Sequence, residues 1–264
     1  MSDPAASVEP SRPAPDETRS VVKAAGLIGV ATFSSRILGF VRDMVLARLF
    51  GATPAADAFF VAYRIPNLLR ELFAEGSMSA AFIPVFTEYH TLKTKRDAWE
   101  LASATFTTLL TIVTAVTLLG ILAAPGIVWL LAPGFRGSPD KLALTTLLTQ
   151  MMFPYLIFIS LAALAMGILN SLRAFAAPAF SPVFFNIFTI ACMMFLSPWL
   201  PEPIIGVAIG IVVGGVAQFA MQLPGLKGRG MLFGLRFQPG HPGVKRIGWL
   251  MVPSLLGLSV TQIN

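Results

Sequence analysis

The stretch LASATFTTLLTIVTAVTLLGILAAPGIVWLL, residues 101–131, carries no Asp, Glu, Lys or Arg. A helix needs about 20 mostly apolar residues to cross the hydrocarbon core of a bilayer, so this stretch predicts a membrane span. Pro125 and Gly126 follow each other inside it. Because proline interrupts the hydrogen bonding of a helix, we expect this helix to end near Ala124.

The composition of the whole chain extends this prediction. The 264 residues are 55% hydrophobic and 12% charged, with a mean hydropathy of +0.75. Soluble domains carry about 25% charged residues, and one domain of this size cannot bury so much apolar surface. The excess must face lipid, which predicts an all-α polytopic membrane protein and excludes a water-soluble enzyme.

Residues 101–131 are the third of seven predicted spans. The others cover 22–50, 55–86, 142–172, 175–200 and 203–223, and a last one begins near Ile247. The predicted organisation is a Pro/Ser/Ala-rich disordered cytoplasmic tail (1–20), a six-helix transmembrane lobe (21–225), a basic cytoplasmic loop (226–246) and a truncated seventh helix (247–264). That helix would reach Asn264 after about 27 Å at 1.5 Å per residue, short of a crossing. We therefore expect the chain to be part of a longer protein.

The distribution of positive charge predicts the orientation of the spans. Lys and Arg number 19 against 13 Asp and Glu, a net charge of +6. Such a balance suits a nucleic-acid partner, but here most of the cations lie in short loops between apolar spans. Twelve lie in the tail and in the second-to-third, fourth-to-fifth and sixth-to-seventh loops, and two lie on the opposite side. Because basic loops stay in the cytoplasm, we expect a cytoplasmic N-terminus and no nucleic-acid partner. The basic loop is expected to lie on the anionic membrane surface.

The first two spans differ from the later ones because they carry arginines. Arg36, Arg42, Arg64 and Arg70 are deep, whereas Arg48 lies near a span end and can reach the interface; spans three to six carry no charge. Charges inside spans are costly and usually face a cavity, although they also pair structurally or extend to the interface. A planar guanidinium binds phosphate oxygens through two donors. We therefore expect a hydrated, net-positive cavity for an anion such as a phosphate or pyrophosphate.

Other polar side chains in these two spans share helix faces with the arginines, since positions three, four and seven apart lie on one face. The two predicted polar stripes are Arg36 with Asp43, and Arg64 with Asn67, Glu71 and Glu75. Gly39 and Pro66 favour bends in the two helices, so we regard them as candidate hinges.

Signals of catalysis are weak. His90 and His241 lie in predicted loops far from the arginines, and no spacing of His, Asp or Glu is typical of a metal site. Cys192 lies in an apolar run and is expected to be an apolar filler. Gly210 and Gly214 form a pair of small residues four apart, which predicts close helix packing.

A series of motifs runs through the chain, beginning at the arginines. The first element is SRILGFVRD (35–43) followed by Phe50-Gly51. The second comprises DAFF (57–60), PNLLR (66–70), FAEG (73–76) and AFIPVF (81–86). Shorter motifs follow in order: APGF (132–135), FPY (153–155), ILNS (168–171), PAFSP (178–182) with Asn186, and QLP (222–224). In these motifs the chain resembles a known family, the lipid II flippases MurJ (MviN).

The resemblance implies the fold of the multidrug/oligosaccharidyl-lipid/polysaccharide exporters, with two six-helix lobes around a V-shaped cavity. This chain would supply the N-terminal lobe and the start of a seventh transmembrane helix, with the C-terminal lobe as its partner. The family moves lipid II, a lipid-linked peptidoglycan precursor that carries a pyrophosphate, from the inner to the outer leaflet of the bacterial cytoplasmic membrane. The implied partners are lipid II and membrane lipids. The implied driving forces are the membrane potential and a coupling cation, with no cofactor in this portion.

The resemblance also implies roles for particular residues. Arg36, Arg42 and Arg70 would be the main substrate-binding cations, and Ser35, Asp43, Asn67 and Glu75 would line the same cavity. Gly39 lies where a flexible first helix would bend. Glu71 departs from the family, because some relatives have a second arginine there, which lowers the positive charge expected of the cavity.

Other classes of protein stay open on the sequence alone. The nearest alternative is an exporter of another lipid-linked oligosaccharide or of a drug, which would carry fewer arginines and more acidic or aromatic groups. A membrane enzyme such as a phospho-sugar transferase would need acidic metal-binding clusters in cytoplasmic loops. A structural or assembly protein would not need arginines in a cavity.

Overall fold

The computed structural model describes residues 15–73, 77–231, 233–234 and 236–263, and every regular element in them is helical. The α-helices are α1 (Pro15–Phe50), α2 (Pro54–Phe73), α3 (Ser77–Leu92), α4 (Lys95–Leu131), α5 (Pro139–Met152), α6 (Tyr155–Ser171), α7 (Ala176–Ala191), α8 (Ile204–Ala220), α9 (Leu223–Lys227) and α10 (Pro242–Ile263). Short turns of other helix types follow α4, as η1 (Pro133–Phe135), and α7, as the π-helical η2 (Cys192–Leu196) and η3 (Ser197–Trp199). The predicted tail, apart from residues 15–20, lies outside the described residues.

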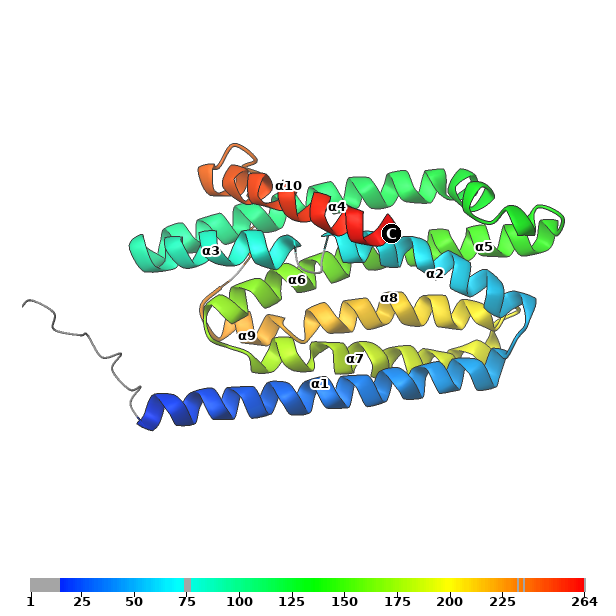
Figure 1. Cartoon of the computed structure of the whole chain (residues 1–264), viewed down its shortest axis with the longest axis horizontal. Coiled ribbons are helices and arrows are strands. Elements are labelled where there is room, and N and C mark those ends of the chain that lie inside the picture. Colours follow the sequence, from blue (N-terminus) through cyan, green and yellow to red (C-terminus); the bar gives the residue numbers. More distant parts are fainter. Residues whose placement is uncertain (1–14, 74–76, 232, 235, 264) are drawn as a thin grey trace, which may run out of the picture.

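The helices run back and forth along the long axis of the molecule (Figure 1). The start of α1, the α3–α4 and α6–α7 connections and the segment between α9 and α10 lie at one end. The α1–α2, α4–α5 and α7–α8 connections lie at the other. The segments that the sequence analysis placed together on the basic side therefore share one end, called here the basic end.

Five described helical segments are long and apolar enough to cross a membrane: Ala25–Phe50, Lys95–Leu131, Pro139–Ser171, Ala176–Trp199 and Ile204–Lys227. They correspond to the first and the third to sixth predicted spans. The second predicted span, 55–86, consists of two helices, α2 and α3, on either side of residues 74–76, which are not described. The last helix, α10, begins at Pro242, before the predicted start near Ile247.

The expected end of the third span at Ala124 is wrong, because α4 continues through Pro125 to Leu131. Proline lacks the N–H that would bond to the carbonyl of Ile121, four residues back. The side chain of Gln150 on α5 supplies the donor instead, with its Nε2 3.1 Å from the Ile121 oxygen. In lipid a freed backbone group needs such a partner, so a residue from another helix keeps α4 continuous.

Close packing of α7 against α8 depends on glycine. A Cβ added to Gly214 would lie 2.8 Å from the Phe185 carbonyl oxygen and 2.8 Å from Thr189 Oγ1. The same hydroxyl donates to the Gly210 carbonyl at 3.1 Å. The predicted packing role of Gly210 and Gly214 is confirmed, because only small residues let two backbones approach this closely.

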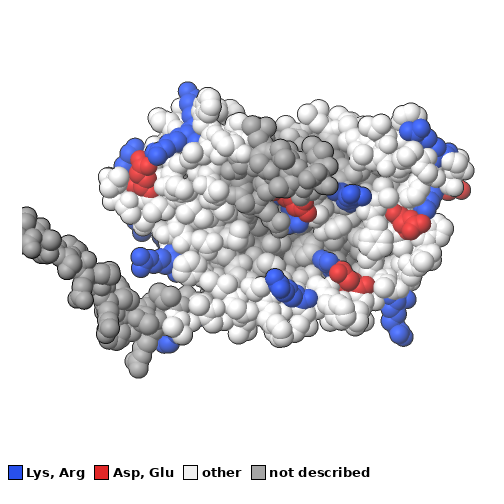
Figure 2. All heavy atoms as spheres, viewed as in Figure 1, with Lys and Arg blue, Asp and Glu red and all other residues white. Residues whose placement is uncertain are grey.

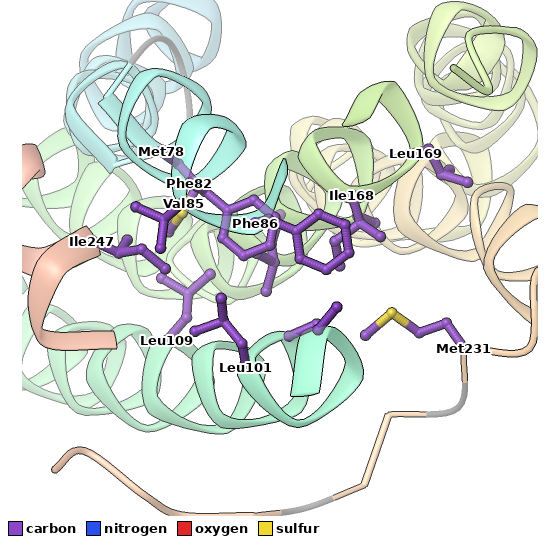
Figure 3. Close-up of a cluster of buried hydrophobic side chains, with 14 of the residues drawn as sticks. Met78, Phe82, Val85, Phe86, Leu101, Leu109, Ile168, Leu169, Met231 and Ile247 are labelled. Atoms are coloured by element: carbon purple, nitrogen blue, oxygen red, sulfur yellow. The ribbon is translucent and has the colours of Figure 1, made fainter. Parts of the chain in front are cut away.

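A buried apolar cluster joins α3 to α4, α6 and α10 (Figure 3). The rings of Phe82 and Phe86 stack at 5.2 Å, and both side chains are fully buried. Gly167 on α6 leaves the space that Phe82 occupies, since a Cβ there would lie 3.2 Å from the ring. This cluster holds α3 against α4 and α6, whereas α1 packs along α7. The first two predicted spans are therefore attached to different parts of the bundle.

The turn after α6 has an unusual residue. Ala174 N–H donates to the Leu169 carbonyl at 2.8 Å, and Arg173 N–H donates to the Asn170 carbonyl at 3.0 Å. This pair of bonds is the Schellman motif, in which the left-handed position is usually glycine. Here Arg173 occupies it, with φ of 55°, and it is the non-glycine residue with positive φ in the described part of the chain. A side chain at such a position costs about 1–2 kcal/mol.

Residue His241 closes the first turn of α10. Its Nδ1 accepts a hydrogen bond from Gly243 N–H at 3.1 Å, so this nitrogen must be unprotonated. Burial lowers the pKa of His241 below its ordinary value of 6.5, and the charge of Lys93 lowers it further. The neutral ring is therefore the form that the folded protein stabilises.

We expect replacement of Gln150 by Leu to lower the free energy of unfolding by about 1–2 kcal/mol, since it leaves the Ile121 carbonyl without a donor. Pro125→Ala restores a backbone N–H to that carbonyl. In the Pro125→Ala background the cost of Gln150→Leu should fall by at least half. Denaturation in detergent micelles of the wild type, both single variants and the double variant measures this coupling, and an equal cost in both backgrounds would contradict it.

The stability contributed by His241 should depend on pH in one direction. Because the folded pKa is depressed, the unfolded chain binds more protons. The contribution is complete above about pH 6.5 and is lost as the pH falls below that value through the folded pKa. Thermal unfolding midpoints of the wild type and His241→Asn, which keeps an acceptor that does not titrate, should converge above pH 7 and diverge at pH 5. Parallel midpoints over this range would contradict the assignment.

Candidate substrate cavity

Charged side chains gather in the middle of one face of the molecule, between α1 and α2, while most of the surrounding surface is uncharged (Figure 2). The two helices that carry these charges pack against different partners, α1 along α7 and α2 along α5. A charged side chain in a membrane protein needs water or a polar partner. The space between α1 and α2 is therefore where the bundle accommodates its charges.

On α1 the centre of this site is Arg42. Its Nε and Nη2 donate to Asp43 Oδ1 at 3.0 and 2.9 Å, and its Nη1 donates to Asn186 Oδ1 on α7 at 3.2 Å. The guanidinium lies 5.9 Å from the ring centroid of Phe185. These contacts hold the Arg42 side chain in one orientation at the space between α1 and α2.

Asn186 joins α1 to α7 through both ends of its amide. Its Oδ1 accepts from Arg42, and its Nδ2 donates to the Ser35 carbonyl at 3.2 Å and to the Pro182 carbonyl at 3.1 Å. The side chain is 5% exposed. A Cβ on Gly39 would lie 3.9 Å from the same nitrogen, so the amide lies opposite the candidate hinge of α1.

A cavity of about 340 Å³ opens beside Arg42 and Asp43. It lies between α1, α2, α7 and α8, and its lining includes the apolar and aromatic residues Leu46, Phe59, Phe60, Tyr63 and Met193. The charged pair thus lies at the edge of a largely apolar space. This arrangement suits a ligand with an anionic group and an apolar neighbour.

The second charged group lies on α2. Asn67 Nδ2 donates to Glu71 Oε1 at 2.9 Å, and Arg70 Nε donates to Asn67 Oδ1 at 3.0 Å. Arg70 Nη2 lies 3.6 Å from Glu71 Oε1. Glu71, which departs from the family pattern, therefore belongs to the same hydrogen-bonded group as Arg70 and offsets its charge.

The other predicted residues are placed as follows. Arg36 is exposed, and Ser35 and Gly39 are half-buried, all on α1, while Pro66 is buried inside α2. Glu75 lies outside the described residues. Arg64, which the sequence placed on a stripe with Asn67, lines a separate groove of about 710 Å³ between α2 and α4.

The charges of the site are partly balanced. The ion pair of Arg42 and Asp43 has side chains 25% and 63% exposed. Such an exposed pair contributes little stability, about 0–1 kcal/mol, so separating Arg42 from Asp43 costs little free energy. Arg36 has no hydrogen bond or ion pair from its side chain within the described part of the chain, which leaves its donors open to an anion.

Sequence reasoning did not assign a role to Asn186. In the sequence Asn186 stands out only as a residue that follows the motif PAFSP (178–182). A detectable signal was present, because an amide inside an apolar span usually hydrogen-bonds to another helix. Its partner, however, is 144 positions away in the sequence, and only the packing of α1 on α7 identifies it.

A bundle of membrane-spanning helices with an arginine held at the edge of a cavity is an arrangement typical of membrane transporters. Residues 46–264 match the family described as lipid II flippase MurJ. A probable lipid II flippase MurJ of Vibrio cholerae is 44% identical over 254 residues, covering 94% of this chain and 48% of that protein. The lipid II flippase MurJ of Burkholderia cenocepacia is 40% identical over 237 residues, with 88% and 46% covered.

The solved structures agree. A lipid II flippase MurJ in an inward closed conformation matches with a TM-score of 0.72 and 29% identity over 90% of this chain and 48% of that one. The chain belongs to the MurJ lipid II flippase family, a family of multi-pass membrane transporters, and the predicted family and fold class are confirmed. The chain spans about half the length of the curated relatives that it matches.

We expect Asn186 and Arg42 to be energetically coupled. Replacing Asn186 by Leu removes a buried amide that bonds both α1 and α7, and should lower the free energy of unfolding by about 1–2 kcal/mol. A double-mutant cycle with Arg42→Met should give a coupling near 0.6 kcal/mol or more, the mean for hydrogen bonds between membrane helices being about 0.6 kcal/mol. Asn170→Leu on α6 serves as the matched control, and a zero coupling energy would exclude the interaction.

Proposed function

We propose that this chain forms the N-terminal lobe of a flippase that moves lipid II from the inner to the outer leaflet of the bacterial cytoplasmic membrane by alternating access. The observation that supports this function best is the ordered guanidinium of Arg42 at the edge of a mostly apolar cavity. Lipid II combines a pyrophosphate with an apolar polyprenyl chain. The family to which the chain belongs is named for the same activity.

The charged residues act on the head group in this proposal. Arg42 and Arg36 replace part of the water that the pyrophosphate loses, because guanidinium donors match phosphate oxygens in pairs. Asp43 releases Arg42 when the phosphate arrives. Arg70 and Asn67 bind from α2, with Ser35 in the remaining lining. The polyprenyl chain stays in lipid and leaves the cavity through a lateral opening.

The change of access uses the weak attachment of α1. In the most apolar part of the span Ala25–Phe50, only 6% of the residues are buried inside the bundle. A bend at Gly39 therefore disturbs few packed side chains. Pro66 gives α2 a second point of bending. Access then alternates as the two lobes rock against each other.

The positive charge of the cavity suggests that the membrane potential supplies energy for transport. An empty net-positive cavity returns to the cytoplasmic side under the membrane potential, which is worth about 2.3 kcal/mol per elementary charge per 100 mV. A coupling cation would bind outside this lobe. The N-terminus and the basic end face the cytoplasm in this orientation, and the C-terminal lobe completes the cavity.

The test is the amount of lipid II accessible at the outer face of cells that depend on this gene, supplied as its full reading frame. Loss of a charge-assisted bond costs about 1.5–3 kcal/mol, so Arg42→Ala should lower externalised lipid II at least tenfold. Arg42→Lys should keep part of the activity, because lysine retains the charge without the paired donors.

Two controls make the result specific. Arg136→Ala removes a cation that stacks on Trp129 at 3.7 Å and does not line the cavity, and it should leave transport unchanged. Membrane insertion of Arg42→Ala should equal that of the wild type. Normal export by Arg42→Ala would exclude its proposed role, and export that does not depend on the gene would favour another lipid-linked oligosaccharide as substrate.

A further inference from the structure

A second cavity, of about 480 Å³, lies at the basic end of the bundle and is separate from the substrate cavity. It is bounded by α1, the turn between α6 and α7, and the α9 segment. Its charged lining residues are Lys23, Arg173 and Arg229, and none of its described lining residues is acidic. Three cations from three separate segments therefore converge on one concave site.

The donors of these cations are largely unused. No hydrogen bond or ion pair joins the side chains of Lys23 or Arg173 to another group in the described ranges. Arg229 Nη1 donates to the Gly225 carbonyl at 3.0 Å, which leaves the other guanidinium donors of Arg229 available. Three like charges with no counter-charge repel one another, and an anion between them removes that repulsion.

The backbone at Arg173 adds an independent observation. This residue occupies the left-handed position of the turn after α6, with φ of 55°, where glycine would be unstrained. Strained positions of this kind cluster at ligand-binding sites. The turn thus accepts strain to present a guanidinium to the pocket.

The rest of the lining is apolar and identifies the kind of anion. Leu27, Leu169 and Phe175 line the same pocket. On α1 the neighbouring apolar side chains are open to the surroundings, with Val22 64%, Val30 61% and Phe33 67% exposed. Exposed apolar side chains on a membrane-spanning helix contact lipid or another helix. Lys23 lies just before the candidate span Ala25–Phe50, which places the pocket at the level where acyl chains and head groups meet, and a soluble anion would leave its apolar part unfilled.

We propose that this pocket binds an acidic phospholipid, with the phosphate between Lys23, Arg173 and Arg229 and one acyl chain along Leu27 and Leu169. In the proposed orientation this end of the bundle faces the cytoplasmic leaflet, where anionic lipids attract basic residues. Lys23 and Leu27 belong to α1, while the other lining residues belong to the α6–α9 region. The lipid therefore bridges the weakly attached α1 to the body of the bundle.

The experiment measures lipid binding to the purified full chain in detergent by native mass spectrometry. The probes are palmitoyl-oleoyl phosphatidylglycerol and palmitoyl-oleoyl phosphatidylcholine. The informative variant is Arg173→Gly, because it removes the cation and also relieves the strained turn. We expect it to lower the affinity for phosphatidylglycerol about fivefold, the effect of one cation near a charged lipid surface, with no loss of thermal stability.

Matched variants separate the site from general charge. Arg173→Lys keeps the charge and should keep most of the binding. Lys245→Gln removes an exposed cation of α10 outside the pocket and should leave binding unchanged. Lys23→Gln should weaken phosphatidylglycerol binding as Arg173→Gly does, since the bridge needs the α1 cation.

Three results would overturn the proposal. They are equal affinity for the two lipids, unchanged phosphatidylglycerol binding by Arg173→Gly, and full displacement of the lipid by millimolar inorganic phosphate, which would assign the pocket to a soluble anion. The assay follows binding and not transport, so its outcome is independent of whether the chain flips lipid II.

Discussion

The hydrogen bond between Arg42 on α1 and Asn186 on α7 is the interaction on which the arrangement of the cavity depends. A guanidinium in a lipid-spanning segment needs a polar partner or water, and α1 buries little of its surface elsewhere. Asn186 also donates to the Ser35 carbonyl, so one buried amide bonds α7 to α1 at two points along the packed pair. Because α1 is thereby held away from α2, a cavity with charged edges opens between the first two helices.

The same need for hydrogen-bond partners inside the protein accounts for other polar contacts of the bundle. The carbonyl that Pro125 frees is taken by Gln150 from α5. Gln222 Nε2 reaches the Ala162 carbonyl on α6 at 3.1 Å. Six threonine hydroxyls of α4 and α5 donate to carbonyls of their own helices, and they belong to Thr105, Thr107, Thr111, Thr145, Thr146 and Thr149. Water cannot serve these groups inside a bilayer, so helices that contain proline and polar residues stay continuous only in the assembled bundle.

Balanced charge distinguishes the substrate cavity from the pocket at the basic end. Arg42 and Arg70 each lie beside a carboxylate, Asp43 and Glu71. Arg173 has no such neighbour. Under the proposed function the head group must be released again after transport, which suits cations that regain an internal partner. A resident lipid has no such requirement, which suits cations that remain without one.

The sequence by itself determined the helical class, the family and the positions of most spans, because apolar length is a local property. It also singled out Arg42, which lines the cavity, because a charge inside an apolar span is visible in the sequence. It misplaced the end of α4, because the partner of the carbonyl that Pro125 frees lies on a neighbouring helix. Only the tertiary structure decided that Asn186 holds Arg42, that Arg64 faces a different groove, and that Lys23, Arg173 and Arg229 share a pocket. These residues are distant in sequence, and the packing of the helices brings them within reach of one another.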